Sequence, residues 1–231
     1  EKQSSSPVMK DMISPMENTV YFLPNSDARQ SQIYFYIPMG DYNREENVRR
    51  EAFNQYISGG FSGLIMNEIR EKNSMAYTAY GFASSRGLPG AQTYFSGYIG
   101  TQNDKAVDAI DLYMKLLTDM PERPGRIDNI KSYLRQSALT DHPDSRNLSL
   151  RIAEWKRRGY TDDPAKEELP LIDSLTFPDI VDYYQKNIKG KPIIIGVLGN
   201  PKDISIDALK KFGKVIRLNE KKLFNEKDTM F

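Results

Sequence analysis

The sequence of 231 residues contains no cysteine and a single histidine, His142. Without cysteine the chain can have no disulfide framework, thiolate zinc site or cysteine nucleophile. The compartment stays open, because reducing and oxidising settings both tolerate such a chain. Zinc catalysis usually takes three protein ligands, most often including histidines. We therefore expect this chain to bind no metal and no other cofactor, and we interpret His142, in a proline-containing loop, as a turn residue.

Net charge and long apolar runs are also nearly absent. The chain carries 32 basic and 31 acidic side chains, well interspersed, for a formal net charge of +1. This balance argues against a basic stripe that follows phosphates, so we expect no nucleic-acid partner. No apolar run approaches the ~20 residues of a membrane-spanning helix. The Gly-rich stretch 59–63 (GGFSG) lacks the lysine and the spacing of phosphate-binding loops and is interpreted as a hinge between helices.

The chain divides into one domain and two flanking segments. Residues 1–18 begin with the polar run EKQSSSP and are interpreted as a linker or a boundary segment, and residues 219–231 as a charged C-terminal tail. No linker or internal repeat divides residues 19–218. We therefore expect a single domain there.

Hydrophobic patterns within residues 19–218 predict alternating pairs of strands and helices. Residues 19–23 and 32–39 flank the turn signal PNSD and predict a hairpin, and residues 192–198 (PIIIGVL) predict a buried or central strand. Further strands are expected over 76–83, 92–99 and 214–218, and helices around 45–57, 61–69, 107–117, 127–138, 148–155 and 208–212 and from Thr176 onward. This order predicts an α+β domain, a mostly antiparallel sheet with helices layered on one face. The expected core includes Val107, Ile110, Leu134, Trp155 and the isoleucines 193–195 with Val197.

One stretch, NEIREKNSMAYTAYGF, joins a helix-like run to a tyrosine-rich strand through a tight turn. Together with the preceding glycines it resembles the signature of non-catalytic C-terminal domains in the pitrilysin/insulinase family of zinc metallopeptidases. That signature has a Gly-rich turn, a helix ending in an Arg-Glu-Lys-like run, and a tyrosine seven residues after the arginine, as Arg70 and Tyr77 are here. Residues 28–40 and 191–201 extend the resemblance to residues 19–218, which implies the metallopeptidase (LuxS/MPP-like) α/β sandwich.

The resemblance implies the fold without the metal. Catalytic domains of the family carry a His-x-x-Glu-His motif on the helix after the second strand. The corresponding residues here, 45–57, include Glu45, Glu46 and Glu51 but no histidine. The chain is therefore expected to be inactive alone, with zinc held by a catalytic domain on the same polypeptide or on a partner chain.

The resemblance also implies a role for Arg70 and Tyr77. Two bowl-like halves would enclose a peptide substrate, and this pair would reach it from the half opposite the zinc. An arginine offers a planar set of donors to peptide carbonyls, and a phenol offers one donor to the oxygen that gains charge during hydrolysis. A plainer interpretation pairs Arg70 with Glu68 or Glu71 on the surface and places Tyr77 in the core.

Two other functions stay open at this point. The domain could be a structural or assembly subunit of the same fold without a proteolytic role, or a peptide-binding module that uses an exposed strand edge. The tyrosines 77, 80, 94 and 98 could stack on bases, but without basic neighbours they are interpreted as a sheet face and core. The substrate stays open, and a bacterial periplasm is the setting that the resemblance suggests.

Overall fold

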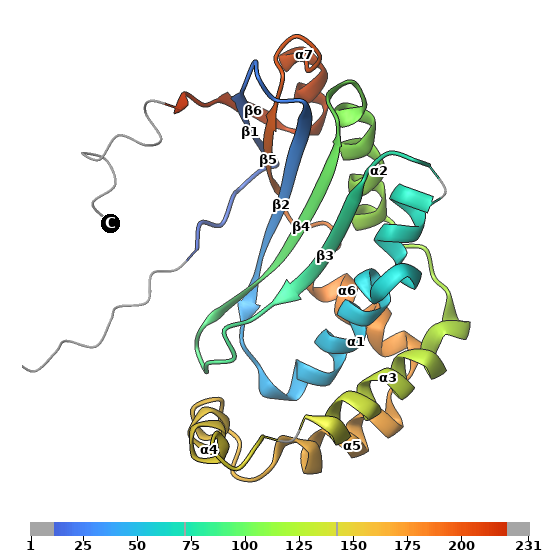
Figure 1. Ribbon diagram of the computed structural model, residues 1–231, viewed down its shortest axis with the longest axis vertical. Helices are drawn as coiled ribbons and strands as arrows, with labels where there is room; N and C mark the ends of the chain where they lie inside the picture. The colour runs from blue at the N-terminus through green and yellow to red at the C-terminus, as the bar shows by residue number, and fades with distance from the viewer. Residues whose placement is uncertain (1–11, 72, 142, 221–231) are drawn as a thin grey trace, which may run out of the picture.

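The computed structural model describes residues 12–71, 73–141 and 143–220, and its body consists of one sheet with helices against it (Figure 1). His142, residues 1–11 of the predicted linker and residues 221–231 of the predicted tail lie outside the described residues. The six strands follow the order β3-β4-β2-β5-β1-β6 across the sheet. They are β1 (Thr19–Pro24), β2 (Gln30–Asp41), β3 (Thr78–Ser84), β4 (Gln92–Gln102), β5 (Ile194–Gly199) and β6 (Lys214–Arg217).

The pairing of these strands confirms the α+β class with a mostly antiparallel sheet, and corrects one detail. β2 is antiparallel to β4 and β5, and β3 is antiparallel to β4, but β1 is parallel to both β5 and β6. The sheet is therefore mixed, and the predicted hairpin of residues 19–23 and 32–39 is wrong. β5 lies between β1 and β2, because a strand this rich in isoleucine and valine is better buried inside a sheet than at its edge.

The helices lie mainly against one face of the sheet (Figure 1). They are α1 (Asn47–Ser58), α2 (Ala106–Thr118), α3 (Ile127–Thr140), α4 (Leu148–Arg157), α5 (Pro164–Ser174), α6 (Phe177–Asn187) and α7 (Ile206–Leu209). The Thr176–Asp179 capping box at the start of α6 is present as predicted. The sequence patterns did not predict α5, which starts at the N-cap Asp163 with Pro164 in its first turn. In the described ranges no helix combines the length and hydropathy needed to cross a membrane.

A buried tyrosine shows how tightly the helices pack on the sheet. The Tyr113 ring of α2 stacks on Phe35 of β2, with ring centroids 4.0 Å apart, and its hydroxyl donates a hydrogen bond to the Tyr80 carbonyl at 2.9 Å. Gly81 and Gly97 are paired across β3 and β4 beneath it. A Cβ at either glycine would lie within 2.4 Å of the Tyr113 hydroxyl oxygen, so the close approach requires residues without side chains.

Five of the eight expected core residues are buried, and the other three are only partly buried. Ile110, Leu134, Ile193, Ile195 and Val197 are buried, and Val107 packs half-buried against the core. Burial alternates along β5, so Ile194 faces the other side of the sheet and is half-buried.

The expectation for Trp155 is wrong, because α4 contributes no buried residue at all. Its apolar stripe was interpreted as a core face, but α4 lies apart from α1, α2 and α6 (Figure 1). Leu148 and Leu150 of α4 are accordingly 45% and 70% exposed. The period of a helix predicts an apolar face and not what covers it.

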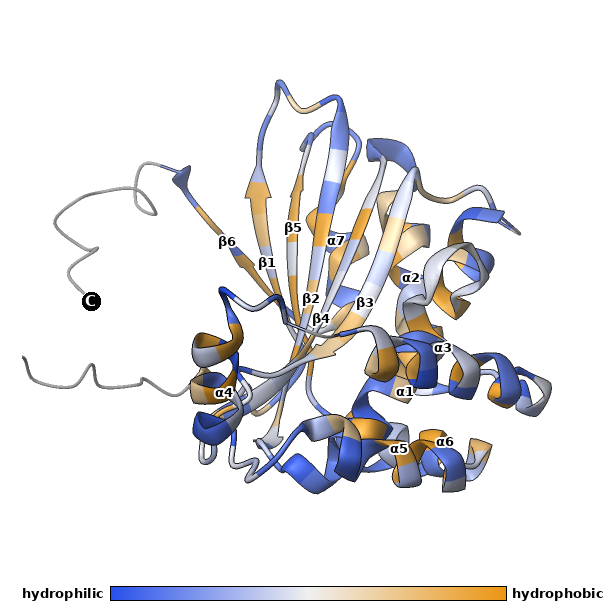
Figure 2. Cartoon of the chain, turned by 60° about the horizontal axis from the view of Figure 1, so that its bottom comes forward, coloured by the Kyte–Doolittle hydropathy of each residue, from blue (hydrophilic) through white to orange (hydrophobic). Residues whose placement is uncertain are grey.

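The face of the sheet away from the helices, called the open face below, is rich in aromatic residues. Alternate strand positions put Tyr34, Tyr36, Tyr80, Tyr94 and Tyr98 on it, and Tyr98 lies 5.1 Å from Tyr34 and 5.3 Å from Tyr80 between ring centroids. No charged residue occupies the positions that share this face in β3, in β4 and in residues 30–38 of β2. Figure 2 shows the corresponding alternation of hydropathy along the strands.

Candidate functional site

The turn between Arg70 and Tyr77 is built by a wide helix and one left-handed residue. Met66–Glu71 form a π-helix rather than the expected α-helix, a form that is frequent at functional sites. Ser74 then adopts φ +50°, and its N–H donates to the Arg70 carbonyl at 2.9 Å. The Tyr77 N–H donates to the Gly100 carbonyl of β4 at 2.9 Å, so Tyr77 is fixed at the entrance to β3.

This turn places Arg70 and Tyr77 at one cavity of about 360 Å³, called the turn cavity below. The remaining lining residues come from the turn and from the end of β4: Glu71, Ser74, Met75, Ala76, Thr101, Gln102 and Lys105. Tyr77 is 53% exposed, so it is not a core residue. Arg70 meets Glu71 at 3.7 Å between Nε and Oε1, in a pair whose side chains are 45% and 53% exposed. An ion pair this open contributes little to stability, and the arginine stays accessible.

Two residues that the sequence did not predict complete the polar lining. Gln102 Nε2 donates a hydrogen bond to the Tyr77 hydroxyl oxygen at 3.0 Å. Because that oxygen accepts from Gln102, the phenolic hydrogen is left to donate into the cavity. Lys105 Nζ donates to the Ser74 carbonyl at 3.3 Å, which ties the start of α2 to the turn. Only the pairing of Tyr77 with Gly100 would have indicated these neighbours.

The charges of the turn cavity are unequal. Arg70 and Lys105 are its cations, and Glu71 is the one carboxylate among its lining residues in the described ranges. The cavity therefore offers several hydrogen-bond donors and a net positive charge to any bound group. A peptide carbonyl or another oxygen with negative charge would match such a lining.

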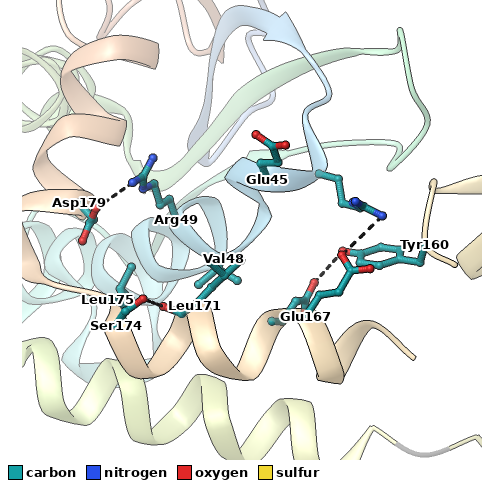
Figure 3. A pocket seen from close by; sticks show the side chains of 11 residues that line it. Glu45, Val48, Arg49, Tyr160, Glu167, Leu171, Ser174, Leu175 and Asp179 are labelled. Carbon is teal, nitrogen blue, oxygen red and sulfur yellow. Dashed lines mark hydrogen bonds and ion pairs between the residues drawn. The ribbon is translucent and has the colours of Figure 1, made fainter. Parts of the chain in front are cut away.

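A larger cavity, of about 410 Å³, lies between the starts of α1 and α6 and one face of α5 (Figure 3). Both of its arginines are paired within the protein: Arg49 lies 3.1 Å from Asp179, and Arg44 lies 3.5 Å from Glu167. These pairs tie the helices to one another. The larger cavity is therefore a junction between helices, whereas the turn cavity keeps donors available.

The edge strand β3 is protected by side chains of α1. Asn54 donates from Nδ2 to the Ala83 carbonyl at 3.0 Å, and its Oδ1 accepts from the Ala83 N–H at 2.7 Å. The Ser58 hydroxyl accepts from the Gly81 N–H at 2.8 Å. Three backbone groups that an added peptide strand would need, the N–H and carbonyl of Ala83 and the N–H of Gly81, are thus occupied. This arrangement argues against a peptide-binding module that works through the β3 edge.

The part of the chain that the structure describes contains no cluster of metal-ligating side chains. Among the residues of the described ranges, no group of three or more histidine, aspartate or glutamate side chains could hold a metal ion. Helix α1, which follows the second strand, turns Ala52, Phe53 and Tyr56 into the core. Its buried face therefore serves packing.

The chain belongs to the family described as "Peptidase M16 inactive domain". The family model matches residues 8–124, just over half of the chain. The match covers the Gly-rich turn, the π-helix and both residues of the Arg70–Tyr77 pair. No curated protein matches the chain significantly.

Solved structures share the fold at low sequence identity. An M16 inactive domain from Pseudomonas fluorescens matches with a TM-score of 0.68 and 15% identity, over 84% of this chain and 47% of that chain. The periplasmic protease PqqL from Escherichia coli matches with a TM-score of 0.65 and 16% identity, over 87% of this chain and 22% of that chain. A chain of complex III2 from Candida albicans matches with a TM-score of 0.60 and 13% identity, over 81% of this chain and 47% of that chain. The chain thus spans about half the length of the first of these structures.

Proposed function

We propose that this chain is the non-catalytic, substrate-contacting half of a two-part zinc peptidase. It would form part of the wall of a peptide-holding chamber, and Arg70 and Tyr77 would contact the bound peptide. One observation carries the proposal: side chains from a helix end and a strand start line a single cavity, and the Tyr77 hydroxyl accepts from Gln102 while keeping its hydrogen for a ligand. The zinc would lie in a catalytic domain on the same polypeptide or on a partner chain.

Uncovered apolar surfaces support the existence of a partner domain. The open face carries exposed aromatic rings such as Tyr34, which is 50% exposed, and α4 exposes Leu148 and Leu150. Contiguous apolar surface of this kind usually marks an interface. A chain that spans 47% of the first matched structure leaves room for a second domain to cover it.

The role of Tyr77 can be tested by removing one hydroxyl group. In the assembled, zinc-loaded peptidase, Tyr77→Phe keeps the ring and deletes the donor. If that donor stabilises the developing oxyanion, kcat falls about 10²- to 10³-fold, the usual scale for one lost donor. Arg70→Lys keeps the charge but loses the planar fork, and we expect it to lower kcat/KM as well.

The chain provides a matched control for this test. Tyr133 of α3 is 53% exposed, as Tyr77 is, and does not line the turn cavity. Tyr133→Phe should therefore leave both kinetic parameters unchanged. Wild-type turnover by the Tyr77→Phe enzyme would remove Tyr77 from the reaction.

The second candidate function is that of a structural or assembly subunit. The fold shared with a chain of complex III2 from Candida albicans favours this alternative. It predicts a partner without a His-x-x-Glu-His motif, and no dependence of any peptidase activity on Arg70 or Tyr77. The sequence of the partner domain and the kinetics of the Tyr77→Phe protein distinguish the two functions.

A further inference from the structure

We propose that the turn cavity binds a carboxylate of the substrate and that Lys105 gives it this preference. The carboxylate would come from an acidic side chain or from the C-terminus of the peptide. This inference rests on the proposed function and deepens it, because it names the class of peptide that the non-catalytic half would favour. Nothing in the family signature, which comprises the Arg70–Tyr77 pair, requires a second cation at this place.

The polar groups of the turn cavity fit an anion better than a neutral carbonyl. Arg70 engages Glu71 through Nε, and no second ion pair holds its guanidinium among the described residues. Tyr77 contributes a free hydroxyl hydrogen, since its oxygen already accepts from Gln102. Gln102 is thus a positioning residue that directs the phenol. A carboxylate, with two oxygens and about four acceptor positions, can accept from several of these donors together.

Lys105 supplies the charge that a neutral substrate group would not need. Its Nζ donates one hydrogen bond to the Ser74 carbonyl at 3.3 Å, which fixes the ammonium group beside the turn. Two of its three N–H donors remain for a ligand. The side chain is half-buried, so its interaction with an anion is less screened than that of a fully exposed lysine.

The position of Lys105 on its helix is a second, independent reason. Lys105 is the N-cap of α2, a helix of 13 residues, where the partial positive charge of the helix disfavours a cation. Asp104 and Asp108 lie on the same turn but do not line the cavity. A bound carboxylate would compensate both the lysine and the helix terminus. We infer that the cost of placing a lysine here is offset when an anionic ligand is bound.

Peptide titrations of the 231-residue chain, followed by NMR, test this inference directly. The probes are acetylated and amidated heptapeptides that differ only in a central Glu, Gln or Lys, plus the Gln peptide with a free C-terminal carboxylate. At low salt we expect the Glu peptide to bind about three- to fivefold more tightly than the amidated Gln peptide, the scale of one partly exposed ion pair. Tighter binding of the free-carboxylate peptide instead would identify the C-terminus as the source.

Three variants separate the role of Lys105 from nonspecific charge effects. Lys105→Met should abolish the preference for the carboxylate, so that the ratio of the affinities for the Glu peptide and the amidated Gln peptide falls to about one. Lys105→Glu should reverse the preference in favour of the Lys peptide. Lys189→Met removes the same charge from the exposed turn after α6, outside the turn cavity, and should keep the wild-type preference.

The outcomes distinguish this inference from the proposed function. Equal affinity for the Glu, free-carboxylate and amidated Gln peptides in the wild-type chain overturns the carboxylate preference. An unchanged preference in Lys105→Met overturns the assignment to Lys105, as does the absence of any shift at Lys105 and Tyr77. Neither result changes the expectation that Tyr77→Phe lowers turnover. Conversely, wild-type turnover in Tyr77→Phe refutes the proposed function while a measured preference at Lys105 would stand.

Discussion

The hydrogen bonds of Asn54 make the protection of the β3 edge measurable. Asn54→Ala deprives the Ala83 N–H and carbonyl of their partners, which lie at 2.7 and 3.0 Å, and Ala83 is only 2% exposed. Each backbone group left unsatisfied costs about 1–3 kcal/mol. Alanine regains roughly 0.5 kcal/mol of helix propensity. For two such groups, less this gain, we expect the free energy of unfolding to fall by about 1.5–5.5 kcal/mol.

Urea denaturation of the wild-type and variant chains measures this loss. Gln55→Ala is the matched control, because it removes an amide from the next position of α1 without breaking a side-chain hydrogen bond found in the described residues. We expect it to change stability by less than about 0.5 kcal/mol. Hydrogen exchange adds a local measurement: the Ala83 amide should exchange faster in Asn54→Ala, whereas Gln55→Ala should keep its protection.

An open edge should also change how the protein associates. With the outward groups of Ala83 free, β3 can pair with a strand of another chain. We expect Asn54→Ala to associate as its concentration rises in size-exclusion chromatography, and wild type not to. If Asn54→Ala matches Gln55→Ala in stability and keeps the protection of the Ala83 amide, the edge is held by packing alone and the argument fails.

Two further predictions concern packing and capping. Gly97→Ala places a Cβ 2.1 Å from the Tyr113 hydroxyl oxygen and should lower the free energy of unfolding by about 1–3 kcal/mol through overpacking. Adding Tyr113→Phe should recover part of this loss in thermal melts. Additive effects of the two substitutions would refute the contact. Burial raises the pKa of Asp179, but its bonds with Thr176 and the Arg49 guanidinium outweigh burial and hold it below its ordinary 3.8. Because folding lowers the pKa of Asp179, its carboxylate stabilises the fold at pH values above 3.8. Asp179→Asn should therefore lower the free energy of unfolding by about 1 kcal/mol in urea melts at neutral pH. The difference from wild type should vanish as the pH falls through the folded-state pKa of Asp179.

Local patterns predicted which elements exist, because each pattern depends on residues close in sequence. The apolar run of β5 and the capping box of α6 are examples. Strand order needs information of another kind: β1 pairs with β5, which follows it by about 170 residues, and no local signal selects that partner over β2. α5 was missed because Pro170 interrupts its interior. Its start was nevertheless marked by Asp163 and Pro164.

The candidate site divides in the same way. Arg70 and Tyr77 belong to one continuous motif, so the sequence predicted them as a pair without knowledge of the strand order. Gln102 and Lys105 reach the turn cavity only because Tyr77 pairs with Gly100 across the sheet. A contact that depends on strand register cannot be predicted from the sequence until the register is known. The donor to the phenol and the second cation were therefore visible only in the structure.

The arrangement of α1 differs from that of the turn cavity in how its polar side chains are used. In this chain the helix after the second strand packs Phe53 and Tyr56 into the core and directs Asn54 and Ser58 at the β3 edge. Each of these contacts stabilises the sheet that carries Tyr77. Side chains committed to core packing and to backbone groups cannot also coordinate a metal ion or bind a substrate. The turn cavity is different, because its arginine, lysine and phenol keep donors that the fold itself does not use.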